Sequence, residues 1–260
     1  MKIKVLYEDS NILAVDKPSG ILVHPSTTLR ASPDKSETIL SLFRKKYPKI
    51  ELVHRLDKET SGVMLLAKNQ KTHEFLKKQF SAPALELANR GLADRQNRIK
   101  KIYHAIVCGH VKNDRGIINK PIGRSPKDFR RHLAGRGARG ELREAITEYR
   151  VLKRLTLPLA PALIKAGEKE KNSPDKGRQE GLYSFLEICP KTGRTHQIRV
   201  HMKFLNHGVV CDSLYNPNSP CPKGISRLAL HASSIEFKNL KDKTIKVESS
   251  LPKEFKKFLA

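Results

Sequence analysis

The segment of residues 53–62, VHRLDKETSG, stands out for side chains that could do chemistry. It places the carboxylate of Asp57 among histidine, arginine and lysine side chains and two hydroxyl groups. Neighbouring positive charges keep a carboxylate ionised, and an ionised carboxylate can act as a nucleophile or as a base. The same residues also fit a purely structural role, in which Asp57 belongs to a turn and Arg55 is its ion partner.

Two known loop types that use similar residues are excluded by the spacing. An EF-hand calcium loop starting at Asp57 would have its glycine in place at Gly62, but Lys68 stands where the loop needs a bidentate glutamate. A protein kinase catalytic loop needs the order His-Arg-Asp and an asparagine five residues after the aspartate. The chain has the order His-Arg-Leu-Asp at residues 54–57, followed by Gly62.

The segment does not stand alone, because it resembles the H-R-L-D-x-x-T-S-G signature of the RluA-like family of RNA pseudouridine synthases. Other motifs of that family follow in the family's order, and the resemblance extends from about Leu6 to Phe237. It implies an enzyme that isomerises specific uridines of structured ribosomal or transfer RNA to pseudouridine without a cofactor. The other matching segments are residues 11–20 (NILAVDKPSG) with 23–25 (VHP), 101–109 (KIYHAIVCG), 193–201 (GRTHQIRVH) and 230–232 (LHA).

The resemblance also implies roles for three residues of the reaction centre. Asp57 supplies the reacting carboxylate, and three roles stay open for it: attack at C1′, attack at C6, or help in deprotonating the ribose. Arg199 is the guanidinium that keeps this carboxylate ionised in a pocket without water. Tyr103 stacks on the uracil and assists proton removal from C5. The plain alternatives are a surface helix residue for Arg199 and a core tyrosine for Tyr103.

Binding of the RNA is expected to involve several basic side chains. A glycosidic bond inside stacked RNA is out of reach, so the target base must be flipped out of the stack. By the resemblance, Arg55 fills the vacated stack or holds the flanking phosphate. The other residues expected to bind the substrate are His54, Arg194, Arg130, Arg131 and Arg136.

Residues 124–140 carry six lysine or arginine side chains against one aspartate, with three glycines and hardly any apolar periodicity. This composition predicts a flexible basic loop. Contact with RNA phosphates is the interpretation that the charge of the whole chain favours, and a solvated surface loop is the plain alternative.

The chain as a whole is strongly basic, with 51 lysine and arginine residues against 26 acidic ones and a net charge of +25. Such a surface repels itself unless a polyanion neutralises it, which favours RNA as the partner. No apolar stretch reaches the roughly 20 residues of a membrane span, and residues 1–8 lack the apolar run of a signal peptide. We therefore expect a cytoplasmic protein without a membrane partner, and we expect it to be a monomer.

The cysteines and histidines predict neither disulfides nor a metal site. The four cysteines form no Cys-x-x-Cys pair and no dense framework. His196, His201 and Cys211 lie close in sequence, but the two histidines are five residues apart, not the four that place two ligands on one helix face. Cys211 also stands where the family commonly has a glycine before an aspartate. We expect free thiols and no metal.

The length of 260 residues fits one catalytic domain over residues 1–260, or two closely joined lobes of it, without an S4-type RNA-binding module ahead. Apolar periodicity predicts strands in short succession and few helices. This order favours an α+β fold, with a largely antiparallel mixed sheet, flanking helices and a central active-site cleft. The expected strands are 12–15, 21–23, 63–67, 102–107, 183–189, 228–232, 235–237 and 244–247; the expected helices are one capped by Ser36, one over 72–80 and one from Thr195 to Gly208; and the insertions are 81–101 and 157–180.

Overall fold

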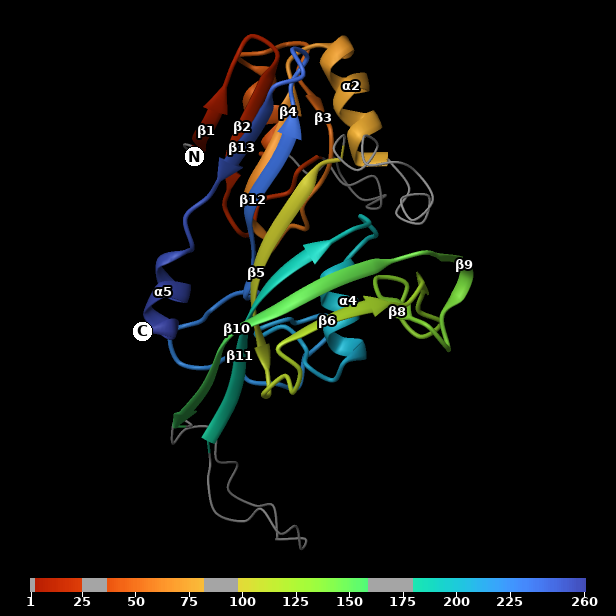
Figure 1. The fold of residues 1–260 in the computed structure, drawn as a ribbon, viewed down its shortest axis with the longest axis vertical. Coiled ribbons are helices and arrows are strands. Elements are labelled where there is room, and N and C mark those ends of the chain that lie inside the picture. The colour runs from red at the N-terminus through yellow and green to blue at the C-terminus, as the bar shows by residue number, and fades with distance from the viewer. Residues whose placement is uncertain (1–2, 25–36, 82–97, 159–179) are drawn as a thin grey trace, which may run out of the picture.

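The computed structural model describes residues 3–24, 37–81, 98–158 and 180–260. Its main feature is one mixed sheet of ten strands, in the order β1-β2-β4-β12-β5-β11-β10-β6, with β13 paired to β12 and β3 paired to β4. The β4 and β12 strands pair in parallel, and the other neighbours pair antiparallel. The predicted α+β fold with a largely antiparallel mixed sheet is confirmed (Figure 1).

The upper part of the sheet in Figure 1 is covered on both faces. Along β4, alternate residues enter two different cores: Val63 and Leu65 join a cluster with Leu76 of α2, while Met64 and Leu66 join a cluster with Ile39 of α1. A strand buried on both faces reads as a continuous apolar run, which is why residues 63–67 contain no polar side chain. The elements of this part are β1 Lys4–Glu8, β2 Ile12–Lys17, α1 Ile39–Arg44, β3 Glu51–Leu52, β4 Ser61–Ala67, α2 Gln70–Ser81, β12 Leu230–Lys238 and β13 Thr244–Glu248.

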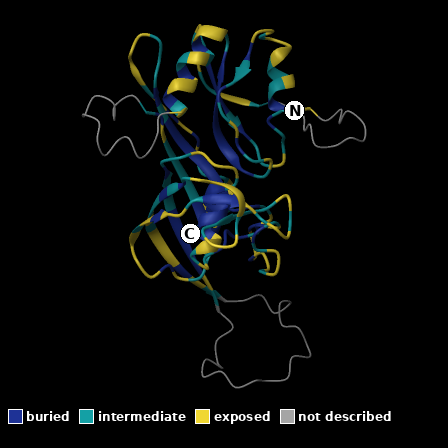
Figure 2. Ribbon diagram, turned by 90° about the vertical axis from the view of Figure 1, so that its right-hand side faces the viewer, coloured by how far each residue is buried: buried dark blue, intermediate teal, exposed yellow. Residues whose placement is uncertain are grey.

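The lower part of the sheet is built on the long antiparallel pair of β10 and β11. β5 joins the two parts, because it pairs with β12 on one side and with β11 on the other. Buried residues fill the interior of both parts (Figure 2). The elements of the lower part are β5 Lys100–Cys108, β6 Arg115–Asn119, β10 Ile146–Pro158, β11 Glu180–Pro190, α4 Gln197–Phe204 and α5 Lys253–Leu259.

The basic segment 124–140 is not the unstructured loop that its composition predicts. It contributes to a second, three-stranded sheet formed by β7 Ile122–Arg124, β8 His132–Ala134 and β9 Arg139–Arg143. Ile122 packs with Val200 of α4 and with Tyr215 in a small buried cluster. A few apolar contacts at the base of the segment therefore fix it, and these are too sparse to show as periodicity.

Several predicted element boundaries are wrong. Residues 21–23 form no strand, because the carbonyls of Leu22 and Val23 accept hydrogen bonds from the first turn of α1; the partner of β2 is instead β1. Thr195 does not cap α4, whose N-cap is His196, and the positive φ after the helix falls on Asn206 and not on Gly208. Thr38 caps α1, and Ser36 lies outside the described residues.

The expected strands at 12–15, 63–67, 102–107, 183–189 and 244–247 and the helix at 72–80 lie where they were expected, within a few residues. The two strands expected at 228–232 and 235–237 form the single strand β12, and β1, β6 and β10 were not expected. The insertion at 157–180 falls between the paired strands β10 and β11, and its residues 159–179 lie outside the described part, as do residues 82–97 of the other insertion. No helix in the described ranges is long and apolar enough to cross a membrane.

The expectation of four free thiols is wrong for two of them. A disulfide joins Cys211 and Cys221, whose Cα atoms are 5.1 Å apart, while Cys108 and Cys189 are free. The turns that follow residue 211 bring these two backbone positions within the range that a disulfide spans. Spacing along the chain could not reveal this approach.

Candidate active site

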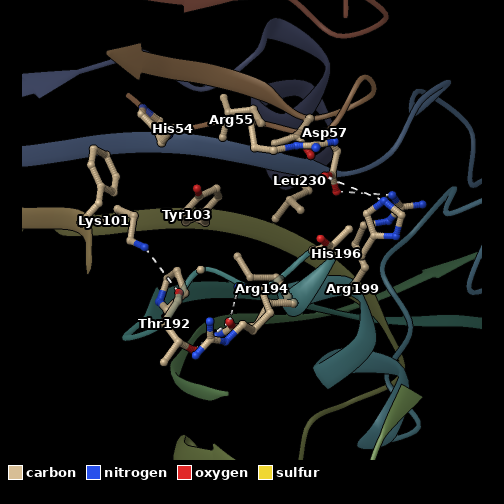
Figure 3. Close-up of a pocket in the computed structure, with 18 of the residues that line it drawn as sticks. His54, Arg55, Asp57, Lys101, Tyr103, Thr192, Arg194, His196, Arg199 and Leu230 are labelled. Carbon is tan, nitrogen blue, oxygen red and sulfur yellow. Dashed lines mark hydrogen bonds and ion pairs between the residues drawn. The ribbon is translucent and has the colours of Figure 1, made fainter. Parts of the chain in front are cut away.

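A cavity of about 590 Å³ opens where the two parts of the sheet meet. Its walls come from the loop before β4, from the end of α2, from β5 and from residues 190–199 at the start of α4. Figure 3 shows Asp57, His196 and Arg199 grouped at one end, Lys101 and Thr192 at the other, and Tyr103 between them. The expected central cleft is therefore present, and segments far apart in sequence line it.

The loop that carries Asp57 is held from below by a buried lysine. The ammonium of Lys17 donates hydrogen bonds to the carbonyls of Lys58 and Thr60, both at 2.8 Å. Ser19 donates to the carbonyl of Glu59 at 2.6 Å. Burial lowers the pKa of Lys17 to about 8, although the Asp57 carboxylate opposes this shift. The turn after β2 thus fixes the backbone that presents the carboxylate.

Gly62 is required where the loop enters β4. Its φ is +114°, and a Cβ at this position would lie 2.1 Å from the carbonyl oxygen of Ala232. No other residue type combines that backbone conformation with so close an approach of the parallel strand β12. The glycine that ends the segment VHRLDKETSG therefore serves the pairing of two strands and leaves the chemistry to other residues.

Arg199 lies between two carboxylates. Its guanidinium donates two hydrogen bonds of 2.7 Å to the fully buried Asp212, and its Nη1 lies 3.4 Å from Oδ2 of Asp57. Asp212 also accepts hydrogen bonds from the backbone N–H groups of Leu214 and Tyr215. Burial disfavours the charge, but the hydrogen bonds that Arg199 donates to the Asp212 carboxylate outweigh it, so the pKa of Arg199 is raised. Asp212 therefore anchors the guanidinium that faces Asp57.

His196 is a second group beside Asp57, and its role was not predicted. Its Nε2 lies 3.9 Å from Oδ1 of Asp57, and its Nδ1 lies 2.9 Å from the hydroxyl of Tyr215. That hydroxyl also accepts a hydrogen bond from the backbone N–H of His132. Burial lowers the pKa of His196, while the neighbouring Asp57 carboxylate opposes the shift.

The backbone at His196 supports this arrangement. Its φ is +55°, a left-handed conformation that is uncommon outside glycine and that tends to occur at functional sites. In the sequence, His196 drew attention only as a candidate metal ligand, although it lies inside the GRTHQIRVH motif. Among the described residues, no three His, Cys, Asp or Glu side chains are grouped as a metal ion would require.

Tyr103 is half-buried on β5 and lines the cavity between its two ends. Burial raises the pKa of its phenol, and the nearby Asp57 adds to the effect. The ring therefore presents a neutral aromatic surface to whatever occupies the cavity. A planar base is a fitting occupant, because aromatic faces stack on it.

Arg55 lines the cavity with an exposed side chain and does not form the ion pair with Asp57 that a structural role would need. No hydrogen bond or ion pair of Arg55 is found within the described part of the chain. Arg194 is also exposed, and its Nε donates to the carbonyl of Glu144 at 2.8 Å. Both guanidinium groups are thus available at the opening of the cavity.

His54 forms part of the cavity wall. Its Nε2 accepts the backbone N–H of Leu65 at 2.9 Å, and its ring stacks on that of Phe80 with centroids 4.7 Å apart. Burial lowers the pKa of His54 to about 3, so the ring is neutral. This histidine therefore contributes shape to the cavity and no positive charge.

The other expected RNA-binding residues lie on the three-stranded sheet. Arg130 grips Asp128 through Nε and Nη2, at 3.1 and 2.9 Å, and these hydrogen bonds lower the pKa of Asp128 to about 2. Arg131 also faces Asp128, at 3.5 Å, whereas Arg136 is exposed and has no partner among the residues described. The sheet reaches the cavity through His132, whose ring contacts that of His196 with centroids 5.9 Å apart.

Residues 11–204 match the family model described as RNA pseudouridylate synthase. The chain belongs to the RNA pseudouridine synthase family. It is an enzyme of the isomerase class that acts on RNA.

Relatives with curated names agree with this membership. The chain is 35% identical over 267 residues to "Ribosomal large subunit pseudouridine synthase D" of Borreliella burgdorferi. The aligned region covers 99% of this chain and 68% of the relative. It is 33% identical over 239 residues to "Dual-specificity RNA pseudouridine synthase RluA" of Vibrio vulnificus, covering 90% of this chain and 77% of the relative. An "Uncharacterized RNA pseudouridine synthase" of Aquifex aeolicus is 36% identical over 233 residues, covering 87% of this chain and 60% of the relative.

Solved structures resemble the fold. "Human RNA Pseudouridylate Synthase Domain Containing 1" matches with a TM-score of 0.66 and 23% sequence identity, over 96% of this chain and 84% of that one. A second human protein, "RNA Pseudouridylate Synthase Domain Containing 4", matches with a TM-score of 0.62 over 96% of this chain. These two likenesses concern the fold.

Proposed function

We propose that this chain converts uridine to pseudouridine in ribosomal or transfer RNA and that Asp57 is the reacting carboxylate. The observation that carries the proposal is the position of Asp57, which faces the cavity 3.4 Å from an arginine that a fully buried Asp212 holds in place. The names of the two curated relatives, one for the large ribosomal subunit and one for dual specificity, support the choice of RNA.

The reaction breaks the N1–C1′ bond of uridine, turns the base and joins C5 to C1′, while N1 gains a proton and C5 loses one. Asp57 takes part by attacking C1′ or C6, or by helping to deprotonate the ribose. Arg199 supplies the countercharge, and the ring of His196 lies beside the other carboxylate oxygen. Tyr103 holds the base by stacking. Burial and the nearby Asp57 raise the pKa of its phenol, so the ring stays neutral.

Access to the glycosidic bond requires the uridine to leave the RNA stack and enter the cavity. Arg55 suits the task of replacing the flipped base or holding a phosphate beside it, because it is exposed at the cavity and has no partner among the described residues. Arg194, on the opposite wall, holds the RNA backbone. The wall residue His54 shapes the cavity for the base.

The small sheet of β7, β8 and β9 extends the RNA-binding surface beyond the cavity. Arg136 is available for contact with phosphates there, since its side chain is exposed and unpaired within the described residues. Arg130 and Arg131 contribute less, because Asp128 already compensates their charge. The single catalytic domain, the monomeric state and the cytoplasmic location remain predictions from the sequence.

The proposal is tested by release of tritium from RNA that contains 5-tritiated uridine, since joining C5 to C1′ expels the hydrogen at C5. Ribosomal and transfer RNA from cells that lack this protein are the two substrates to compare. We expect release from one or both of them. Binding without release from either would favour an RNA-binding protein that kept the fold and lost the chemistry.

A further inference from the structure

The end of the cavity away from Asp57 holds a lysine that the proposed reaction does not use. Lys101 and Tyr103 are alternate residues of β5, so both side chains point to the cavity (Figure 3). Alternate residues on a strand are about 7 Å apart. That separation is comparable to the length of one nucleotide in an extended RNA strand. A nucleotide held at Tyr103 would place a neighbouring linkage near Lys101.

The ammonium of Lys101 has few partners. It donates a long hydrogen bond of 3.4 Å to the carbonyl of Thr192, and its Nζ lies over the ring of Phe80, 5.9 Å from the centroid. The described residues place no carboxylate within ion-pair distance of it. An ammonium has three N–H donors, so two are left for a ligand. Burial lowers its pKa to about 8, and Arg98 adds to this shift.

Arg98 strengthens the positive charge at this end. Its guanidinium lines the same cavity and donates to the carbonyl of Lys191. Burial lowers the pKa of Arg98, and Glu144, on the cavity wall, opposes the shift. Within the described ranges Glu144 forms no ion pair with Arg98 or Lys101, and its Oε1 has no hydrogen-bond partner. The two cations therefore face the cavity without full compensation.

We propose that Lys101 and Arg98 form a phosphate subsite for the linkage next to the target uridine. This inference rests on the proposed function. A phosphodiester suits the place because it accepts hydrogen bonds from both side chains and supplies the negative charge that they lack. A second base suits it less, since the nearby aromatic ring of Phe80 is already covered by His54 and by Lys101 itself.

The experiment combines a protein change with an RNA change. The probe is a labelled heptanucleotide with one central uridine, compared with two versions in which the linkage on either side of that uridine is a neutral methylphosphonate. Affinity is measured on the D57N background, so that no turnover occurs. K101M is compared with K100M, because Lys100 is exposed and lies on the other face of the strand.

We expect one of the two neutral linkages to weaken binding to the D57N parent about tenfold, the effect of one charged hydrogen bond. K101M should discriminate clearly less between that version and the natural RNA, because only Arg98 then remains to contact the linkage, and its slope of log affinity against log salt should be smaller by about 0.7. K100M should keep the discrimination, and K101R should restore it.

The inference would be overturned if neither neutral linkage weakened binding to the parent, or if K101M discriminated between linkages as strongly as K100M does. Turnover of natural RNA by the protein with an intact Asp57 is a separate measurement. Absence of turnover by that protein would count against the proposed function. Equal discrimination between the linkages by K101M and K100M would count against the subsite alone.

Discussion

Replacement of Asp212 by asparagine tests whether the buried pair, and not Arg199 alone, prepares the site. Oδ1 of Asp212 accepts from Nη2 of Arg199 and from two backbone N–H groups, so the amide oxygen of an asparagine would take that place. The amide nitrogen must then face Nε of Arg199, where Oδ2 now accepts at 2.7 Å. Two N–H donors would then face each other, and the buried guanidinium would lose one of its two hydrogen bonds to residue 212.

Breaking one side of a buried ion pair costs about 3–5 kcal/mol, and D212N should lie near the lower figure because it keeps three of four hydrogen bonds. For a chain of this length about 3 kcal/mol corresponds to a fall in Tm of about 6–12 °C. Arg199 would no longer be held 3.4 Å from Asp57, and a misplacement of about 1 Å costs about 100-fold in kcat.

The assay is thermal unfolding together with tritium release at saturating RNA, below the Tm of the variant. D128N is the matched control, because Asp128 makes a similar two-point contact with the exposed Arg130. We expect no measurable change in Tm or kcat for D128N. A D212N protein with the Tm and kcat of the wild type would refute the view that Asp212 positions Arg199.

Three further predictions concern other parts of the molecule. K17M leaves the carbonyls of Lys58 and Thr60 without their hydrogen-bond donor, so it should lower the free energy of unfolding by about 1–3 kcal/mol and reduce kcat. Chemical denaturation and tritium release measure the two effects, and unchanged values would contradict the anchoring role of Lys17. R136S should reduce the slope of log RNA affinity against log salt concentration by about 0.9, and R130S should reduce it by clearly less, because Asp128 already pairs with Arg130. Equal reductions by the two variants would contradict this difference. The free energy of unfolding should rise with pH above about 8, because the pKa of Lys101 is lowered to about 8 in the folded protein and the unfolded chain then binds more protons. K101M should show a shallower rise, and the same rise in K101M as in the wild type would contradict the lowered pKa of Lys101.

The residues expected at the reaction centre lie inside contiguous motifs, and this made them predictable. Asp57 and Arg199 are separated by 142 positions in the chain, yet each stands at a fixed place in its own motif. The sequence also predicted the sheet type and several of its strands, since runs such as residues 63–67 are long enough to show their burial.

The partners of these residues could not be predicted, because they depend on how distant segments meet. Nothing in the pattern of residues links Lys17 to the carbonyls of the Asp57 loop, or Tyr215 to the ring of His196. The three-stranded sheet was missed for a related reason, since Ile122 and a few neighbours anchor it while most of its residues are basic and exposed.

The most direct test of the account is the activity of D57N with 5-tritiated RNA, measured beside its affinity for the same RNA. Asparagine keeps the size of the side chain but cannot act as a nucleophilic carboxylate, while affinity comes mainly from lysine and arginine contacts with phosphate. We expect D57N to fold, to bind RNA with nearly unchanged affinity and to release no tritium above background. Turnover by D57N at more than a trace of the wild-type rate would contradict the assignment of Asp57 as the reacting group.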